Sequence, residues 1–145
     1  MRLEWQREDY LISTDKARLD LNIIHGFLVT SYWAEGRFKE AVEKSVAGSL
    51  CFGVFKSDAQ AGFARVITDY ATLAYLADVF VLEPHRGRGL GRWLVETVLT
   101  YPPLQTCGWT LFTKDAHDLY RRFGFDPSTA PERLMRRQAL RDKPL

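Results

Sequence analysis

The sequence predicts an α/β (α+β) fold in which helices pack on a mixed β-sheet. Apolar residues switch repeatedly between strand-like runs and helical spacing, in the order β-α-α-β-β-β-α-β-α-β. A run of strands followed by a β–α–β unit implies a mixed sheet with helices on it. A chain of 145 residues, 46% of them hydrophobic, can bury one core of ordinary size. We therefore expect a single domain over residues 1–145.

The N-terminal half predicts a strand, two helices and a β-hairpin. Leu21, Ile24 and Leu28 recur at helical spacing, and Gly48 is well placed to end the second helix. Residues 56–60 have the length and composition of a hairpin turn. The expected elements are a strand at 10–14, helices at 19–33 and 36–47, and strands at 50–55 and 62–68.

The C-terminal half predicts the β–α–β unit and two shorter elements. Leu90, Leu94 and Val98 mark a helix that Pro102 and Pro103 follow. The expected elements are a long strand at 71–82, a helix to about residue 100, a strand at 109–113, a helix at 115–123, a strand or turn at 124–125 and a helix at 131–140.

Charge and composition narrow the class of protein. A formal net charge of +2 is too balanced for nucleic acid as the main partner. No apolar run has the length of a membrane span, and the charged N-terminus does not resemble a signal peptide. Cys51 and Cys107 have no metal-ligand spacing, so we expect free thiols and no metal. These observations predict a cytoplasmic protein that binds neither nucleic acid nor membrane.

The segment 78–94 carries the clearest functional signal. An apolar strand runs into Pro84, then into a turn with glycines at alternate positions, and then into a helix. Gly87, Gly89 and Gly91 let the backbone approach a ligand closely, and a helix N-terminus favours a bound anion. Arginines 86, 88 and 92 add positive charge. The segment therefore predicts a phosphate cradle, although glycines placed only for turn geometry are the plain alternative.

Three other phosphate-binding loops fit this segment poorly. A Walker A loop needs Gly-Lys-Ser/Thr, whereas Gly91 is followed by Arg92 and Trp93. A dinucleotide fingerprint needs G-x-G-x-x-G, whereas these glycines are evenly spaced. A kinase-type glycine loop joins two strands rather than a strand and a helix.

Two motifs together resemble the GCN5-related N-acetyltransferase (GNAT) superfamily. The first is Arg86-x-x-Gly89-x-Gly91 after the strand, and the second is the segment 116–125, which is similar to Ala-x-x-Leu-Tyr-x-x-x-Gly-Phe. The resemblance implies a mixed, mostly antiparallel sheet of six to seven strands flanked by about four helices. It also implies an acetyltransferase that uses acetyl-CoA as co-substrate, with no metal.

The resemblance implies a set of cofactor-binding residues along the strand and the loop. Loop amides would hold the pyrophosphate, and strand backbone would pair with the pantetheine arm in the manner of an added strand. Thr113 stands where the family often has asparagine, so its contact with pantetheine is the weakest part of the match. The cofactor-binding candidates are Val79, Phe80, Val81, Arg86, Gly87, Arg88, Gly89, Leu90, Gly91, Arg92 and Thr113.

Tyr120 and Asp78 are the catalytic candidates. The family often uses the tyrosine of the second motif to protonate the departing thiolate, although Tyr120 also fits a core aromatic position. Asp78 interrupts an apolar strand, which would be costly without purpose, and it is the first candidate for a general base. Glu83 is a second candidate, and a water relay is a third. The oxyanion donor is expected among the main-chain N–H groups of residues 79–81.

The acceptor substrate is the part of the expected reaction that the sequence specifies least. Aromatic side chains near the first two helices and the long strand would suit a small cationic amine, namely Tyr32, Trp33, Tyr70 and Tyr75. We expect a small-molecule or peptide amine as acceptor, with a homodimer as a further option. Two other functions are left open: a coenzyme A-binding module without catalysis, and a generic nucleotide-phosphate binder.

Overall fold

The computed structural model describes residues 2–128 and 130–140. Its strands are β1 (Glu4–Arg7), β2 (Tyr10–Ser13), β3 (Leu50–Lys56), β4 (Ala59–Thr68), β5 (Leu73–Val81) and β6 (Gly108–Thr110). Its α-helices are α1 (Leu21–Leu28), α2 (Lys39–Ala47), α3 (Leu90–Leu99) and α4 (His117–Arg121). Short 3-10 turns lie at Lys16–Arg18, Glu83–His85, Pro102–Leu104 and Pro131–Arg133.

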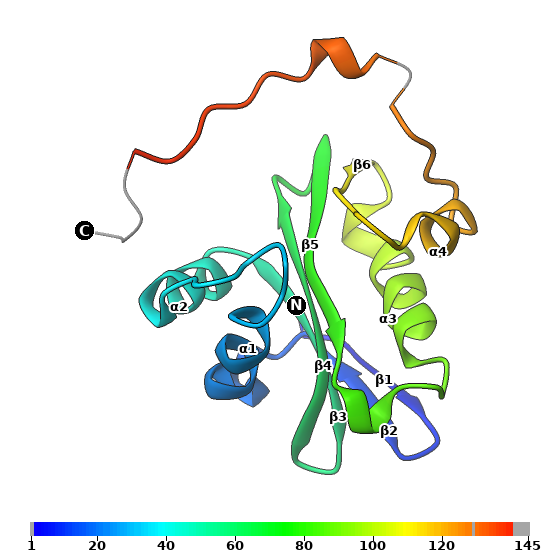
Figure 1. Cartoon of the computed structure of the whole chain (residues 1–145). Helices are drawn as coiled ribbons and strands as arrows, with labels where there is room; N and C mark the ends of the chain where they lie inside the picture. Colours follow the sequence, from blue (N-terminus) through cyan, green and yellow to red (C-terminus); the bar gives the residue numbers. More distant parts are fainter. Residues whose placement is uncertain (1, 129, 141–145) are drawn as a thin grey trace. The chain divides into compact units, whose positions relative to one another are not determined.

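The six strands form one sheet in the order β1-β2-β3-β4-β5-β6. Each of the first four neighbouring pairs is antiparallel, and β5 pairs with β6 in parallel. In Figure 1, α1 and α2 lie on one side of this sheet and α3 on the other. The mixed, mostly antiparallel sheet with four α-helices confirms the predicted fold class.

The helices bury their apolar stripes against the sheet. On the side of α1 and α2, Ile24, Leu28, Val42 and Val46 pack with Phe63 and Phe80. On α3, Leu94, Val95 and Val98 are buried. Side chains of this size contribute about 1.5–3 kcal/mol each when they are fully buried, so both helix layers are firmly held on the sheet.

The β5 strand carries a β-bulge at Asp78. Phe63 pairs with Phe80, and Arg65 pairs with Ala77, so two steps along β4 correspond to three steps along β5. Asp78 itself has a φ of 53°, in the left-handed region that residues other than glycine rarely adopt. A bulge of this kind bends a strand and re-aims the side chains around it.

Beyond its first residues, β5 has an open edge. The pairing of β5 with β6 covers Leu73, Ala74 and Tyr75. For the rest of β5, no described strand pairs on that side. The Leu82 N–H donates to the Ala61 carbonyl over 2.8 Å, so backbone groups of even-numbered residues here are directed toward β4. Val79 and Val81 therefore direct their backbone groups toward the open edge.

The main differences from the expected elements lie near the N-terminus, at the end of α1 and in the segment 131–140. The strand β1 was not expected, and α1 ends at Leu28 rather than near residue 33. Of the strand or turn expected at residues 124–125, the structure has a turn, which covers residues 122–124. The helix expected at 131–140 is a single 3-10 turn at Pro131–Arg133. Leu134, Met135 and Leu140 are mostly exposed, so this segment has no buried face to hold a helix together.

The chain divides into two compact units, Met1–Phe112 and Thr113–Leu145. The first contains the whole sheet with α1, α2 and α3, and the second contains α4. The single domain over residues 1–145 stays a prediction. Within the described residues, the helices are all too short or too polar to cross a membrane.

Candidate functional site

A cavity of about 390 Å³ opens beside the glycine turn. One wall comes from the open-edged part of β5, one from the turn and the start of α3, and one from the α1 side of the sheet. The lining residues are Phe27, Trp33, Val79, Phe80, Val81, His85, Arg86, Gly87, Gly89, Leu90 and Gly91. Most of the cofactor-binding candidates are thus brought together around one space.

The turn meets the cavity with backbone rather than side chains. Gly87 and Gly89 have φ values of 80° and 77°, a conformation that glycine adopts without steric cost. A Cβ added at either position would meet no atom of the part of the chain that the structure describes within 4 Å, so the space beside them is open. Ordinary side chains at these positions would project into that space and fill it.

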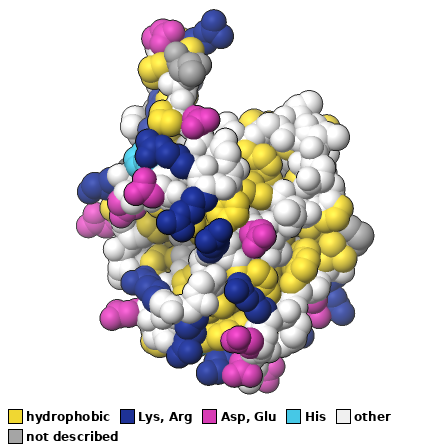
Figure 2. Space-filling view, turned by 90° about the vertical axis from the view of Figure 1, so that its right-hand side faces the viewer, with side chains coloured by type: hydrophobic (Ala, Val, Ile, Leu, Met, Phe, Trp, Pro, Cys, Tyr) yellow, Lys and Arg dark blue, Asp and Glu magenta, His cyan; other side chains and the backbone are white. Residues whose placement is uncertain are grey.

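The start of α3 has the properties of an anion site. Gly89 occupies the N-cap position, and no side chain of the described residues caps the helix. The first amides of a helix lack partners within the helix, and the helix dipole favours negative charge there. Figure 2 views the molecule from the side on which α3 lies, and Lys and Arg side chains lie there together with Asp and Glu side chains, between hydrophobic ones.

His85 and Arg86 join the turn to the sheet. The Tyr10 hydroxyl and His85 Nδ1 are hydrogen-bonded over 2.8 Å, and the two rings pack edge to face. Arg86 Nε donates to the Val81 carbonyl over 2.9 Å, so this side chain folds back on the strand. Arg88 and Arg92 are exposed and do not line the cavity. Their predicted contact with the cofactor stays a prediction.

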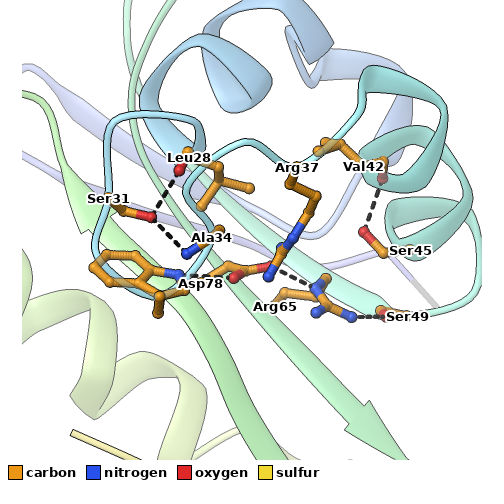
Figure 3. A network of polar contacts seen from close by, with 10 residues as sticks. Leu28, Ser31, Ala34, Arg37, Val42, Ser45, Ser49, Arg65 and Asp78 are labelled. Carbon is orange, nitrogen blue, oxygen red and sulfur yellow. Dashed lines mark hydrogen bonds and ion pairs between the residues drawn. The ribbon is translucent and has the colours of Figure 1, made fainter. Parts of the chain in front are cut away.

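Asp78 lies at the centre of a buried polar network (Figure 3). Its side chain is 2% exposed, and Arg37 Nη1 and Arg65 Nε both donate to Oδ2, over 3.0 and 2.8 Å. Trp33 Nε1 donates to Oδ1 over 2.9 Å. Arg65 also donates to the Ser49 hydroxyl over 3.1 Å.

These contacts disfavour the role of general base that the sequence suggests for Asp78. A base must reach the proton that it removes, and both oxygens of this carboxylate already accept hydrogen bonds from within the fold. Sequence reasoning missed Arg37 and Arg65 as its partners. The signal was available for Arg65, which interrupts one apolar strand just as Asp78 interrupts the next.

The four aromatic residues proposed for the acceptor are spread more widely. Trp33 lines the cavity, and Tyr32 packs edge to face against it with ring centroids 5.1 Å apart. Tyr75, which lies on β5, packs against Phe112. Tyr70 lies in the exposed turn after β4. Of these four aromatic residues, only Trp33 lines the described cavity.

The turn that contains Tyr70 is also hydrogen-bonded through Asp69. Hydrogen bonds from the Thr72 hydroxyl and neighbouring amides lower the pKa of Asp69.

The second unit contains Thr113 and Tyr120. Tyr120 is buried on α4, with its ring edge against Phe125 at a centroid distance of 5.8 Å. The Thr113 hydroxyl oxygen accepts a hydrogen bond from the Ala116 amide and thereby supports the turn before α4. The roles of Tyr120 and Thr113 stay predictions.

The residues around the cavity fit coenzyme A. Its pyrophosphate needs amide donors and positive charge, which the uncapped start of α3, the open glycine positions and Arg86 offer. Its pantetheine arm needs backbone partners, and Val79 and Val81 direct theirs toward the open edge. Among the described residues, no three His, Cys, Asp or Glu side chains gather as metal ligands would.

Comparisons with known proteins support this interpretation. Residues 47–127 match a family model described as an acetyltransferase (GNAT) domain. A protein described as a GNAT-family acetyltransferase from Xanthomonas campestris pv. campestris is 45% identical, with a TM-score of 0.87, over 90% of this chain and 93% of that one. A GNAT-family acetyltransferase from Elizabethkingia anophelis, solved with acetyl-CoA bound, is 16% identical with a TM-score of 0.63, over 84% of this chain and 79% of that one.

A curated protein of Gibberella zeae, described as an acetyltransferase, is 33% identical to this chain. That match covers 63% of this chain and 63% of the Gibberella protein, so the chain spans less than two thirds of its length. The family model covers more than half of the chain, and the Xanthomonas structure is similar over nearly all of it. The chain therefore belongs to the GNAT acetyltransferase family.

Proposed function

We propose that the protein transfers an acetyl group from acetyl-CoA to a primary amine of a small molecule or peptide. The observation that carries the proposal is the open edge of β5 beside the uncapped start of α3, around one cavity. The open strand edge suits the extended pantetheine arm of acetyl-CoA, and the start of α3 suits its charged pyrophosphate. Acetyl-CoA, when bound, supplies the activated acetyl thioester.

The proposed roles follow from what each group offers. Amides of the turn at 86–91 and of the first turn of α3 hold the pyrophosphate. Val79 and Val81 orient the pantetheine arm through their backbone groups. One of their N–H groups is also the better candidate for the oxyanion donor, because the Phe80 N–H is directed toward β4.

We propose that Tyr120 holds a proton on its phenol oxygen and gives it to the departing thiolate. A phenol can act as a general acid and donate its proton to sulfur. Because Asp78 is enclosed by its donors, we propose a water relay rather than this carboxylate for deprotonation of the amine. Trp33 in the cavity wall, with Tyr32 packed against it, offers aromatic surface that suits a cationic amine before it loses its proton.

The experiment is a transfer assay with acetyl-CoA and a panel of amines, amino acid derivatives and peptides. Thiol release and acetylated product are both measured, the latter by mass spectrometry. We expect at least one amine to gain an acetyl group together with equal thiol release. Tight binding of coenzyme A without transfer to any amine would favour the non-catalytic binding module instead.

A further inference from the structure

The network around Asp78 joins three parts of the chain that are distant in sequence. Trp33 and Arg37 come from the segment between α1 and α2, Arg65 from β4, and Asp78 from the bulge in β5. Hydrogen bonds to α1 hold this segment near both of its ends. The Ser31 hydroxyl donates to the Leu28 carbonyl, and the Arg37 carbonyl is hydrogen-bonded to His25 Nε2 over 2.9 Å.

Asp78 is the link between this segment and the sheet. Three donors converge on it, and only a carboxylate offers two acceptor oxygens in that small space. An asparagine would present one oxygen and an NH₂ group, so at least one of the three donors would face another donor. The network therefore depends on the charge and the shape of Asp78 together.

One end of the network lines the cavity. Trp33 is a lining residue, and its ring lies near Phe27, which stacks on Phe80 with centroids 4.1 Å apart. The hydrogen bond from Trp33 Nε1 to Asp78 thus fixes one wall of the cavity to the strand that forms the next wall. A side chain fixed in advance need not be ordered when a ligand binds.

We propose that Asp78 is a positioning residue, which, with Arg37 and Arg65, holds Trp33 as the wall of the cavity that faces the pantetheine and acetyl end of the cofactor. The proposal rests on the proposed binding of acetyl-CoA. It separates Asp78 from proton transfer: the carboxylate acts through Trp33 and never meets the amine.

The first test follows the Trp33 indole by two-dimensional ¹H–¹⁵N NMR. The Trp33→Phe variant identifies the Trp33 Nε1–H resonance by its loss. In Asp78→Asn we expect that resonance to shift and to lose its protection from exchange with water. The same change at an exposed position, Asp58→Asn in the turn between β3 and β4, should leave it unaltered.

The second test measures affinity by calorimetry. We expect Asp78→Asn to weaken coenzyme A binding about three- to tenfold, the factor that corresponds to ordering one or two side chains on binding. Adenosine 3′,5′-bisphosphate lacks the pantetheine arm, so its affinity should stay the same. A loss of global stability alone would change neither of these two affinities, because both are measured on the folded protein.

If Asp78→Asn does not fold, the double variant Asp78→Asn/Arg37→Gln takes its place. It removes one positive and one negative charge together, so the net charge of the network is kept while the tether is lost. We expect the same NMR and affinity changes from it.

One outcome would overturn the proposal: a folded Asp78→Asn protein that keeps the Trp33 resonance and the wild-type affinity for coenzyme A. If that variant also loses acetyl transfer, Asp78 acts as a base. If the wild type transfers acetyl to no amine, the NMR and calorimetric results still decide the role of Asp78, so the two failures are distinguishable.

Discussion

Arg65 Nε and Asp78 Oδ2 lie 2.8 Å apart at the point where β4 and β5 slip in register. The bulge places Asp78 in a left-handed backbone conformation, and the ion pair with Arg65 joins the bulged strand to its neighbour. Strain of this kind persists only where surrounding contacts hold it. The network around Asp78 provides these contacts and connects the bulge to one wall of the cavity.

Loss of the Asp78 carboxylate should destabilise the protein strongly. Asp78→Ala leaves the Arg37 and Arg65 guanidinium groups without their shared partner, and we expect a loss of about 3–5 kcal/mol in the free energy of unfolding. Urea denaturation at pH 7 measures it. The control is Arg2→Ala, which removes an exposed ion pair with Asp15 and should cost less than about 1 kcal/mol. Equal effects of the two variants would contradict the central place of Asp78 in the network.

Two glycines of the turn should respond to alanine in opposite directions. Gly89 has a φ of 77°, so Gly89→Ala should destabilise the protein by about 1–2 kcal/mol through backbone strain. Gly91 lies in the first turn of α3, where a Cβ would meet only Val81 at an ordinary distance of 3.9 Å. Gly91→Ala should therefore raise stability by about 0.5–1 kcal/mol. Thermal unfolding of both variants checks the pair, and a stabilising Gly89→Ala would show that the turn has another conformation.

The thiol of Cys51 should resist alkylation in the folded protein. Burial raises the pKa of Cys51 to about 11 from an ordinary value of 9.0. We expect iodoacetamide to label Cys51 only after denaturation, as mass spectrometry of the native and unfolded protein would show. Rapid labelling of Cys51 in the native state would contradict the buried position.

The same shift predicts how stability depends on pH. Because the folded pKa lies above the unfolded value, the contribution of Cys51 is fully present below pH 9 and is lost as pH rises from 9 toward 11. The difference in unfolding free energy between wild type and Cys51→Ala should therefore shrink over this range. A difference that stays constant would show that the thiol titrates equally in both states.

Tyr120→Phe should lower turnover and leave cofactor affinity unchanged. Loss of a general acid costs about 10²-fold or more in rate, and the phenol is not proposed to bind the cofactor. Steady-state kinetics with the amine found in the panel, together with calorimetry of coenzyme A, separate the two quantities. Unaltered turnover would remove Tyr120 from the mechanism, and a fall in affinity alone would make it a binding residue.

The strand, the glycine turn and α3 were predictable because their signals are local. Apolar runs, turn glycines and helical spacing follow one another within residues 71–100, and the structure has β5 and α3 there. The early end of α1 was harder to predict from the sequence. The hydroxyls of Thr30 and Ser31 donate to carbonyls of the last helical turn, which competes with continuing the helix.

The network around Asp78 could not be read from the sequence. Its hydrogen bonds join residues 13 to 45 positions apart, and its geometry depends on a one-residue bulge. The edge strand β1 was missed because most of its residues are exposed, so apolar alternation is weak there. A helix at 131–140 was expected from local signals alone, although the segment has no buried face.

The central claim is that the cavity beside the glycine turn binds acetyl-CoA by its pyrophosphate and its pantetheine arm. Thermal unfolding with acetyl-CoA, ATP or NAD at equal concentrations tests it most directly. Acetyl-CoA at 100 times its dissociation constant should raise the free energy of unfolding by about 2.7 kcal/mol, while ATP and NAD give much smaller shifts. Equal stabilisation by all three, or none by acetyl-CoA at millimolar concentration, would contradict the account.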